Sequence, residues 1–289
     1  AVAPRGVGRS SDTYTNVIAM PLLALFDAET AVAPRGMSLE KSQAQEPRNR
    51  RSFERRTKVD ESLAPFAEVG EEWNVLLLGG RNYIAYEENE YTHMAKNRDE
   101  DVTVVLSGSV EKWPGGVETD LHEDTNDAEK ILDLYLEVMG HDVIYDDSKL
   151  LEPLKKLQGS FAFVLFDRKG SGHVLASKDG NDTQTLHWGC TPEGGLLFGT
   201  ERNLLDRCNP TATSFPNGVL FSSQGSLLAT CPGSKGWSML SGHPSGHLLS
   251  FERPDYGVKT IPRINSKGVL CGAVYRVSSS KNLDPTISA

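Results

Sequence analysis

The chain has 289 residues, of which 38% are hydrophobic and 24% charged, as is usual for a globular protein. Its net charge of −9 argues against a general nucleic-acid binder, because phosphate contacts require clustered Lys and Arg. No run approaches about 18 consecutive apolar residues, which excludes a transmembrane helix. The four cysteines lie far apart and form no CxxC pair, so they indicate reduced thiols without a disulfide framework or a zinc site.

The N-terminal region differs in charge from the rest of the chain. Residues 1–19 carry two arginines and one acidic residue, and we interpret them as a leader or N-terminal extension. A divergent basic loop is expected over 36–70, with six positive charges between residues 48 and 58. The body is predicted to be one domain over 20–277, followed by a flexible polar tail at 278–289. Reduced cysteines favour a cytoplasmic location, with an organelle (mitochondrion or chloroplast) as the alternative.

Hydrophobic patterning predicts strands and then helices in the first half of the chain. Strands are expected over 22–26, 74–78, 82–86 and 102–106. Asn126 and Glu129 have capping-box spacing and start a helix whose apolar residues recur at helical period up to Gly140. A second, shorter helix is predicted over 148–157.

From residue 159 the sequence is β in character, with Gly, Asp and Asn in the gaps. The predicted strands span 160–166, 173–177, 185–188, 196–199, 218–221, 247–251 and 268–277. Two helices between two groups of strands favour layered α+β packing over alternating βαβ units.

Several polar groups could bind metals or act in catalysis, but their spacing indicates structural roles. Asp179 and Asp182 lack the other ligands of a calcium loop and indicate a plain turn. The pair Asp146 and Asp147 indicates a solvated loop or a helix N-cap. His187 lies in a predicted strand and is expected to serve packing. We therefore expect no metal and no cofactor.

An ordered series of motifs begins at the first predicted helix. It comprises Asn-Asp-Ala-Glu at 126–129, Gly-Ser-Phe-Ala-Phe-Val at 159–164, Lys-Asp at 178–179, Leu-His-Trp-Gly at 186–189 and Phe-Pro-Asn-Gly at 215–218. In this order the motifs resemble the glutaminase domain of asparagine synthetases and other class II glutamine amidotransferases.

The two ends of the domain resemble one particular group of relatives of these enzymes. The segments 246–254 and 269–277, and the start at 20–26, resemble the plant aluminium-induced, stem-specific proteins, which are stand-alone relatives of that glutaminase domain. The resemblance implies an α+β fold, the four-layer αββα sandwich of N-terminal nucleophile hydrolases, and a plant or algal source.

The catalytic pattern that this resemblance implies is incomplete. Class II glutaminases use an N-terminal Cys as nucleophile, an Asn and a Gly N–H for the oxyanion, an Asp for the substrate amine and an Arg for its carboxylate. Here Pro21 stands at the nucleophile position, and Ser107 and Gly108 at the oxyanion position. The region 83–96 offers no matching Arg. Asp127 matches the amine-binding Asp, although the helix dipole would also favour a carboxylate there.

These departures predict a catalytically inactive amidotransferase-like protein that acts as a binding or scaffold subunit. It would have a protein partner or form a homodimer, and Asp127 would contact an amino-acid-like ligand, without nucleic acid or membrane insertion. One alternative is an active glutaminase or amidohydrolase with a substituted nucleophile, either Ser107 or Pro21 after processing. Another is a structural accessory subunit of a larger organellar complex, with the basic N-terminal segment as a docking element.

Overall fold

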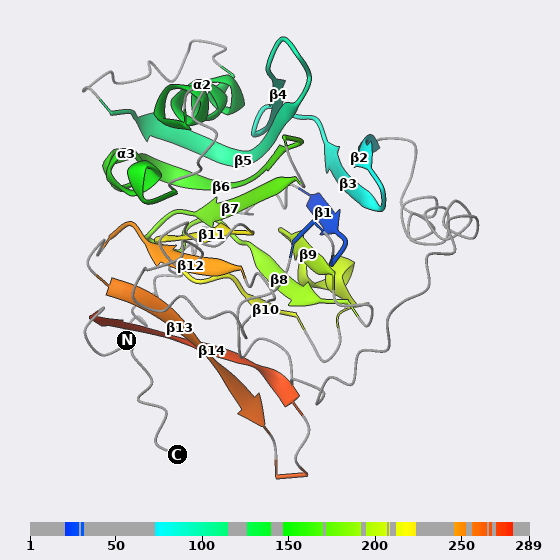
Figure 1. Cartoon of the computed structure of the whole chain (residues 1–289), viewed down its shortest axis with the longest axis vertical. Coiled ribbons are helices and arrows are strands. Elements are labelled where there is room, and N and C mark those ends of the chain that lie inside the picture. The colour runs from blue at the N-terminus through cyan, green and yellow to red at the C-terminus, as the bar shows by residue number, and fades with distance from the viewer. Residues whose placement is uncertain are drawn as a thin grey trace, which may run out of the picture.

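The computed structural model describes thirteen stretches of the chain (Figure 1). They are residues 21–28, 30–31, 73–114, 126–139, 147–169, 172–191, 195–206, 208, 212–223, 246–252, 256–264, 266–267 and 270–279. The predicted leader at 1–19, the basic loop at 36–70 and residues 280–289 lie outside these stretches.

One antiparallel sheet has six strands in the order β10-β8-β9-β1-β3-β2. Its strands are β1 (Leu22–Phe26), β2 (Trp73–Gly79), β3 (Asn82–Glu87), β8 (His187–Cys190), β9 (Leu196–Gly199) and β10 (Thr213–Ser214). The strand β1 lies between β9 and β3 and is the most apolar of the six, as expected for a strand with a neighbour on each side.

The other antiparallel sheet has eight strands in the order β14-β13-β12-β11-β7-β6-β5-β4. They are β4 (Thr92–Lys96), β5 (Val102–Lys112), β6 (Gln158–Asp167), β7 (His173–Lys178), β11 (Val219–Ser222), β12 (His247–Ser250), β13 (Tyr256–Ile264) and β14 (Leu270–Ser279). The long β5 and β6 pair along most of their length and carry the helices.

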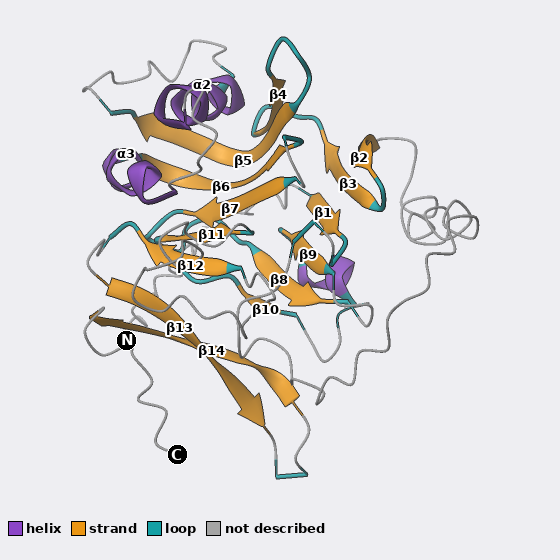
Figure 2. Ribbon diagram, in the orientation of Figure 1, coloured by secondary structure: helices purple, strands orange, loops and turns teal. Residues whose placement is uncertain are grey.

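Helices cover the outer face of the eight-stranded sheet (Figure 2). They are α2 (Asp127–Met139), the 3₁₀ turn η1 (Asp147–Leu150) and α3 (Leu151–Lys156), while a second 3₁₀ turn, η2 (Arg202–Leu205), packs on the six-stranded sheet. The cap predicted for α2 is confirmed, since Asn126 Oδ1 accepts the N–H groups of Ala128 at 3.0 Å and Glu129 at 3.4 Å.

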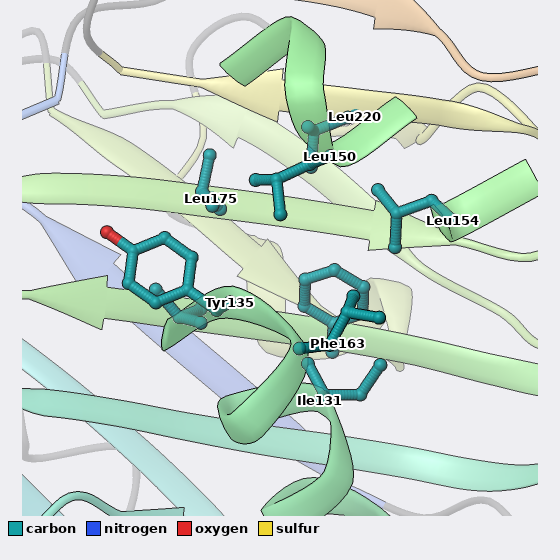
Figure 3. A pocket seen from close by; sticks show the side chains of 9 residues that line it. Ile131, Tyr135, Leu150, Leu154, Phe163, Leu175 and Leu220 are labelled. Carbon is teal, nitrogen blue, oxygen red and sulfur yellow. The ribbon is translucent and has the colours of Figure 1, made fainter. Parts of the chain in front are cut away.

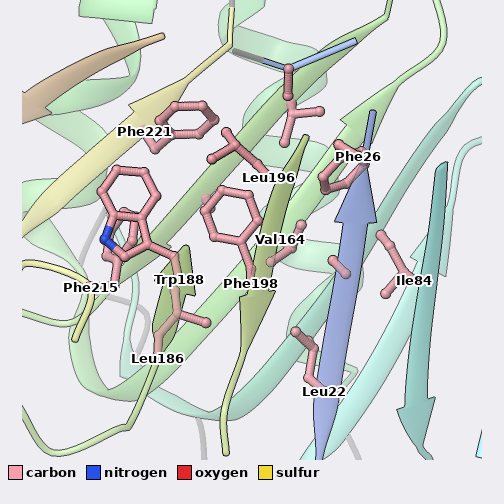
Figure 4. Packing of buried hydrophobic residues seen from close by; sticks show 14 of the residues in the cluster. Leu22, Phe26, Ile84, Val164, Leu186, Trp188, Leu196, Phe198, Phe215 and Phe221 are labelled. Atoms are coloured by element: carbon pink, nitrogen blue, oxygen red, sulfur yellow. The ribbon is translucent and has the colours of Figure 1, made fainter. Parts of the chain in front are cut away.

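The main core lies between the two sheets and is rich in aromatic residues (Figure 4). Trp188 of β8 is 0% exposed and packs against Phe198, Phe215 and Phe221, with ring centroids 4.9–5.8 Å apart. Its Nε1 donates a hydrogen bond of 2.5 Å to the hydroxyl of Tyr275, which reaches over from β14. The buried rings therefore hold the two sheets together, with the indole N–H satisfied.

A second core joins the helices to the eight-stranded sheet. Ile131 and Tyr135 of α2 and Leu154 of α3 pack on Phe163 and Leu220, which point away from the first core because side chains alternate along a strand. The described residues thus form a helix layer on two stacked antiparallel sheets, and the predicted layered α+β packing is confirmed at this level.

Some elements differ from the sequence-based expectation. The strands β4, β10 and β13 are not predicted, and the second helix is divided into η1 and α3. Ser278 and Ser279, predicted to begin the flexible tail, belong to β14 and lie opposite Gly257 and Tyr256. Backbone pairing places them there, and it requires no apolar side chain.

Candidate functional site

Asp127 lies in the first turn of α2, where the resemblance predicts a ligand contact. Asp127 is 7% exposed, and its Oδ2 accepts a hydrogen bond of 2.8 Å from the backbone N–H of Val110 in β5. Its Oδ1 lies 3.6 Å from Nζ of Lys130, one turn further along the helix. The carboxylate therefore ties the start of α2 to β5, and its Oδ1 accepts no hydrogen bond from the described residues.

Ser107 and Gly108 are adjacent in β5, as the sequence places them, but each already has a partner. The Oγ of Ser107 is buried and accepts a hydrogen bond of 2.7 Å from Nε2 of Gln184. The N–H of Gly108 donates to the carbonyl of Tyr91 at 2.7 Å. Gly108 has φ of 101°, and a Cβ added there would lie 1.9 Å from the carbonyl oxygen of Ser160, so the position requires glycine.

Pro21 immediately precedes β1, and a chain of hydrogen bonds connects this end of β1 to Ser107. Leu22 N–H donates to Oγ1 of Thr200 at 2.9 Å, and the carbonyl of Thr200 accepts from Oγ1 of Thr185 at 3.0 Å. Thr185 follows Gln184, whose amide reaches Ser107. The structure therefore links the predicted nucleophile and oxyanion positions across the two sheets through Thr200 and Gln184. Sequence reasoning did not identify either of these residues as part of the site.

Charged groups stand at the end of β7 and in the loop after it, a region interpreted from the sequence only as a turn. Lys178 is 1% exposed, and its Nζ lies 2.5 Å from Oδ1 of Asp182, whose side chain is 62% exposed. The turn itself is confirmed, because the carboxylate of Asp179 accepts the N–H groups of Asn181, Thr183 and Gln184. In the sequence, the signal for a buried Lys178 is its position directly after the predicted strand 173–177.

His187 stands beside this loop at the start of β8, half-buried rather than fully packed. Burial is the largest cause that lowers its pKa below 6.5, and the positive charges of Lys178 and Arg202 lower it further. The neutral imidazole is therefore the form favoured by the fold.

This shift predicts a pH dependence of stability. Because the folded pKa of His187 lies below its unfolded value, the stability from His187 is complete above about pH 6.5 and is lost as the pH falls through the folded pKa. We expect the variant His187→Gln to lose less free energy of unfolding between pH 7.5 and pH 5.5 than the wild type, measured by urea denaturation. Equal losses in the two proteins would contradict the assigned shift.

Of the two roles predicted for Asp146 and Asp147, the solvated loop is wrong for Asp147, which begins the 3₁₀ turn η1, while Asp146 lies outside the described residues. Asp147 is 3% exposed at the start of η1, where its carboxylate accepts a hydrogen bond from Oγ of Ser222 and lies 3.4 Å from Nε2 of His173. His173 Nε2 is also 3.0 Å from Ser222 Oγ. A catalytic Ser-His-Asp triad uses opposite nitrogens of the imidazole for Ser and Asp, whereas here both contact Nε2. With His173 0% exposed, the cluster is a buried structural anchor for η1.

A small apolar pocket lies beside this anchor, between the helices and the eight-stranded sheet (Figure 3). Its walls are Ile131, Leu134, Tyr135, Leu150, Leu154, Phe163, Leu165, Leu175 and Leu220. The lining offers a single polar group, the hydroxyl of Tyr135, and that hydroxyl donates to Asp167 at 2.9 Å. The pocket is therefore a feature of core packing and is unsuited to a charged amino acid.

The two cysteines whose side chains the structure describes are buried. Burial raises the pKa of Cys190 and of Cys208 to about 12, so neither is a reactive thiolate near neutral pH. No group of three or more His, Cys, Asp or Glu side chains within the described stretches has a geometry that could hold a metal ion. In the same stretches, no helix is long and apolar enough to cross a membrane.

Two solved structures resemble the chain weakly. One is described as the allosteric regulatory enzyme of purine biosynthesis (TM-score 0.33, 12% identity, 50% of this chain and 33% of that one). The other is glutamine phosphoribosylpyrophosphate amidotransferase from B. subtilis complexed with ADP and GMP (TM-score 0.38, 10% identity, 70% and 46%). The match thus spans between a third and just under half of the length of these solved chains.

Sequence comparison gives the stronger result. No curated protein matches the chain significantly. The sequence profile of a family described as aluminium induced protein matches residues 23–235, which is well over half of the chain. This match confirms the resemblance inferred from the motifs, and the chain belongs to the aluminium-induced protein family.

Proposed function

We propose that this protein is a catalytically inactive, amidotransferase-like domain that binds a small ligand or a protein partner. The observation that carries the proposal is the residue before β1. The resemblance places the nucleophile there, and Pro21 has no side chain that could attack a carbonyl. The proposal includes the four-layer αββα sandwich, for which the two stacked sheets and the helices α2 and α3 supply three layers.

The surroundings of Ser107 and Gly108 support an inactive site. The Gly108 N–H, which would stabilise an oxyanion, is used by the Tyr91 carbonyl. Ser107 as a substituted nucleophile would need a neighbouring base to accept its proton. Its described partner is the amide of Gln184, which donates a hydrogen bond and does not act as a base. These contacts favour the binding proposal over the active amidohydrolase.

A protein partner is supported by the edge of the six-stranded sheet. The strand β2 is the last of that sheet, and it exposes Val75 by 39% and Leu77 by 65%. An edge strand with exposed apolar side chains is a typical site for pairing with another chain. We propose that a partner or a second copy of this chain covers β2, in a cytoplasmic or organellar assembly.

The ligand part of the proposal is tested by thermal denaturation. We expect millimolar glutamine, asparagine or glutamate to raise the Tm of the wild-type protein, because a ligand that binds only the folded state stabilises it. Asp127→Asn should reduce this rise, since it removes the charge that would contact the ligand amine. Asp133→Asn, on the exposed side of α2, is the matched control. The absence of any rise in the wild type would contradict the ligand proposal.

A further inference from the structure

The ammonium of Lys178 is buried at the end of β7, inside the space between the two sheets. Lys178 is 1% exposed, and Val174 and Ala176, on the same face of β7, belong to the core between the sheets. Because side chains alternate along a strand, Lys178 points into that same space. Burial of a cation costs several kcal/mol unless an anion and hydrogen bonds offset it, so this ammonium requires an anionic partner.

Its partner comes from outside the core. The carboxylate of Asp182 lies 2.5 Å from Nζ of Lys178, yet 62% of the Asp182 side chain is exposed. The backbone of Asp182 has φ of 59°, a left-handed conformation that is uncommon for a residue other than glycine. The hydrogen bond from Lys178 is also the largest cause that lowers the pKa of Asp182 below 3.8. A strained surface loop thus places one carboxylate against a buried cation.

The ammonium has donors to spare. An ammonium has three N–H donors, and the described hydrogen bonds give Lys178 one acceptor, Asp182. A bound carboxylate could use two of these donors, and it would provide the same negative charge that Asp182 now provides. The carboxylate of Asp182 therefore occupies the position that the carboxylate of a ligand could take.

A second polar group lies in the same row of the sheet as Lys178. In the register of the eight-stranded sheet, Ser107 of β5 is opposite Ala162 of β6, and Ala162 is opposite Lys178 of β7. Two strand spacings, roughly 10 Å, separate the backbones of Ser107 and Lys178. Ala162 between them has the smallest side chain with a Cβ. Ser107 is bonded to the amide of Gln184 on this face and Ala162 is packed in the core between the sheets, so the row is buried and a ligand could reach Lys178 only from the side of the Asp182 loop.

From this arrangement we propose that Lys178, at the end of β7, anchors the carboxylate of a small carboxylic acid, and that Asp182 occupies the anchor until the ligand displaces it. The inference deepens the proposed binding function and rests on it, because it names the ligand class and the residue that binds the acid group. Lys178 would also supply the cation for the ligand carboxylate. The sequence lacks such a cation in the region 83–96, where the resemblance to class II glutaminases places an arginine.

The test uses glutarate, a five-carbon dicarboxylate with no amine to contact Asp127 and no amide to hydrolyse. Isothermal titration calorimetry at fixed ionic strength compares the wild type with Asp182→Asn, which keeps the loop's shape but removes the competing charge. We expect Asp182→Asn to bind glutarate at least about tenfold more tightly than the wild type does, because the variant has no carboxylate that competes with glutarate for Lys178. A tenfold change in Kd corresponds to about 1.4 kcal/mol. Asp133→Asn, with the same charge change on α2, should bind like the wild type.

Two further measurements make the result specific. Lys178→Met in the Asp182→Asn background should abolish the gain, and the neutral diamide glutaramide should not bind Asp182→Asn more tightly than the wild type. Equal glutarate affinity in the wild type and Asp182→Asn would overturn the inference, whether or not the double variant folds. So would a double variant that folds and binds as tightly as Asp182→Asn. Ammonia release from glutamine would instead overturn the inactive function, so the two failures are distinguishable.

Discussion

Replacing Gly108 with alanine is expected to lower the free energy of unfolding by more than about 3 kcal/mol. The added Cβ would lie 1.9 Å from the carbonyl oxygen of Ser160, which belongs to the backbone of β6 and cannot rotate away. Relief requires the paired strands β5 and β6 to separate next to α2. The left-handed φ of 101° adds the conformational cost of a Cβ in that region.

The chain provides a matched control for this effect. Gly79, the last residue of β2 before the turn to β3, has nearly the same φ of 100°, but a Cβ added there meets nothing within 4 Å. Gly79→Ala should therefore cost only the conformational term, about 1–2 kcal/mol. Chemical denaturation of both variants measures the difference. Equal losses of stability would contradict the close contact between β5 and the carbonyl of Ser160.

Removal of the Asp147 carboxylate is expected to have the second largest effect, about 3 kcal/mol of destabilisation in Asp147→Ala. The substitution leaves Ser222 and His173 in a buried site without the acceptor that both now contact. The substitution removes hydrogen bonding to a charged acceptor in a buried site, where the contact of 3.0 Å between His173 and Ser222 remains. The loss should also release η1 from the sheet. Asp147 is the first residue of η1, and it contacts His173 of β7 and Ser222 of β11.

The control for Asp147 is Asp133→Ala, which removes a carboxylate from the exposed side of α2 and should change stability by less than about 0.5 kcal/mol. Urea denaturation followed by circular dichroism measures both variants. A small effect of Asp147→Ala, comparable to that of the control, would indicate that the carboxylate is solvated, as the sequence suggested.

Local signals explain which parts of the fold could be predicted. The start of α2 follows from Asn126 and its two N–H partners, all within four residues, and β1 and β9 follow from short apolar runs. The strand β10 has only two residues, and β13 contains Pro262 and two basic residues, so neither has the pattern of a strand. Their strand geometry comes from neighbours distant in the chain.

The candidate site was predicted as a set of positions rather than as a set of contacts. Motif order placed Pro21, Ser107, Gly108 and Asp127, but it could not show that Gln184, 77 residues from Ser107, holds its hydroxyl. The buried roles of Lys178 and Asp147 were missed for the same reason. A charged residue is normally exposed, and only the pairing of strands and loops shows which charges are enclosed.

An inactive domain and an amidohydrolase differ in the release of ammonia and glutamate from L-glutamine, measured on the purified protein with its N-terminal residue identified in the same sample. We expect no release above that of a heat-denatured control, because Pro21 precedes β1 and Gln184 and Tyr91 occupy the groups at Ser107 and Gly108. Release that rises in proportion to protein concentration, and that Ser107→Ala abolishes, would contradict it and establish an amidohydrolase.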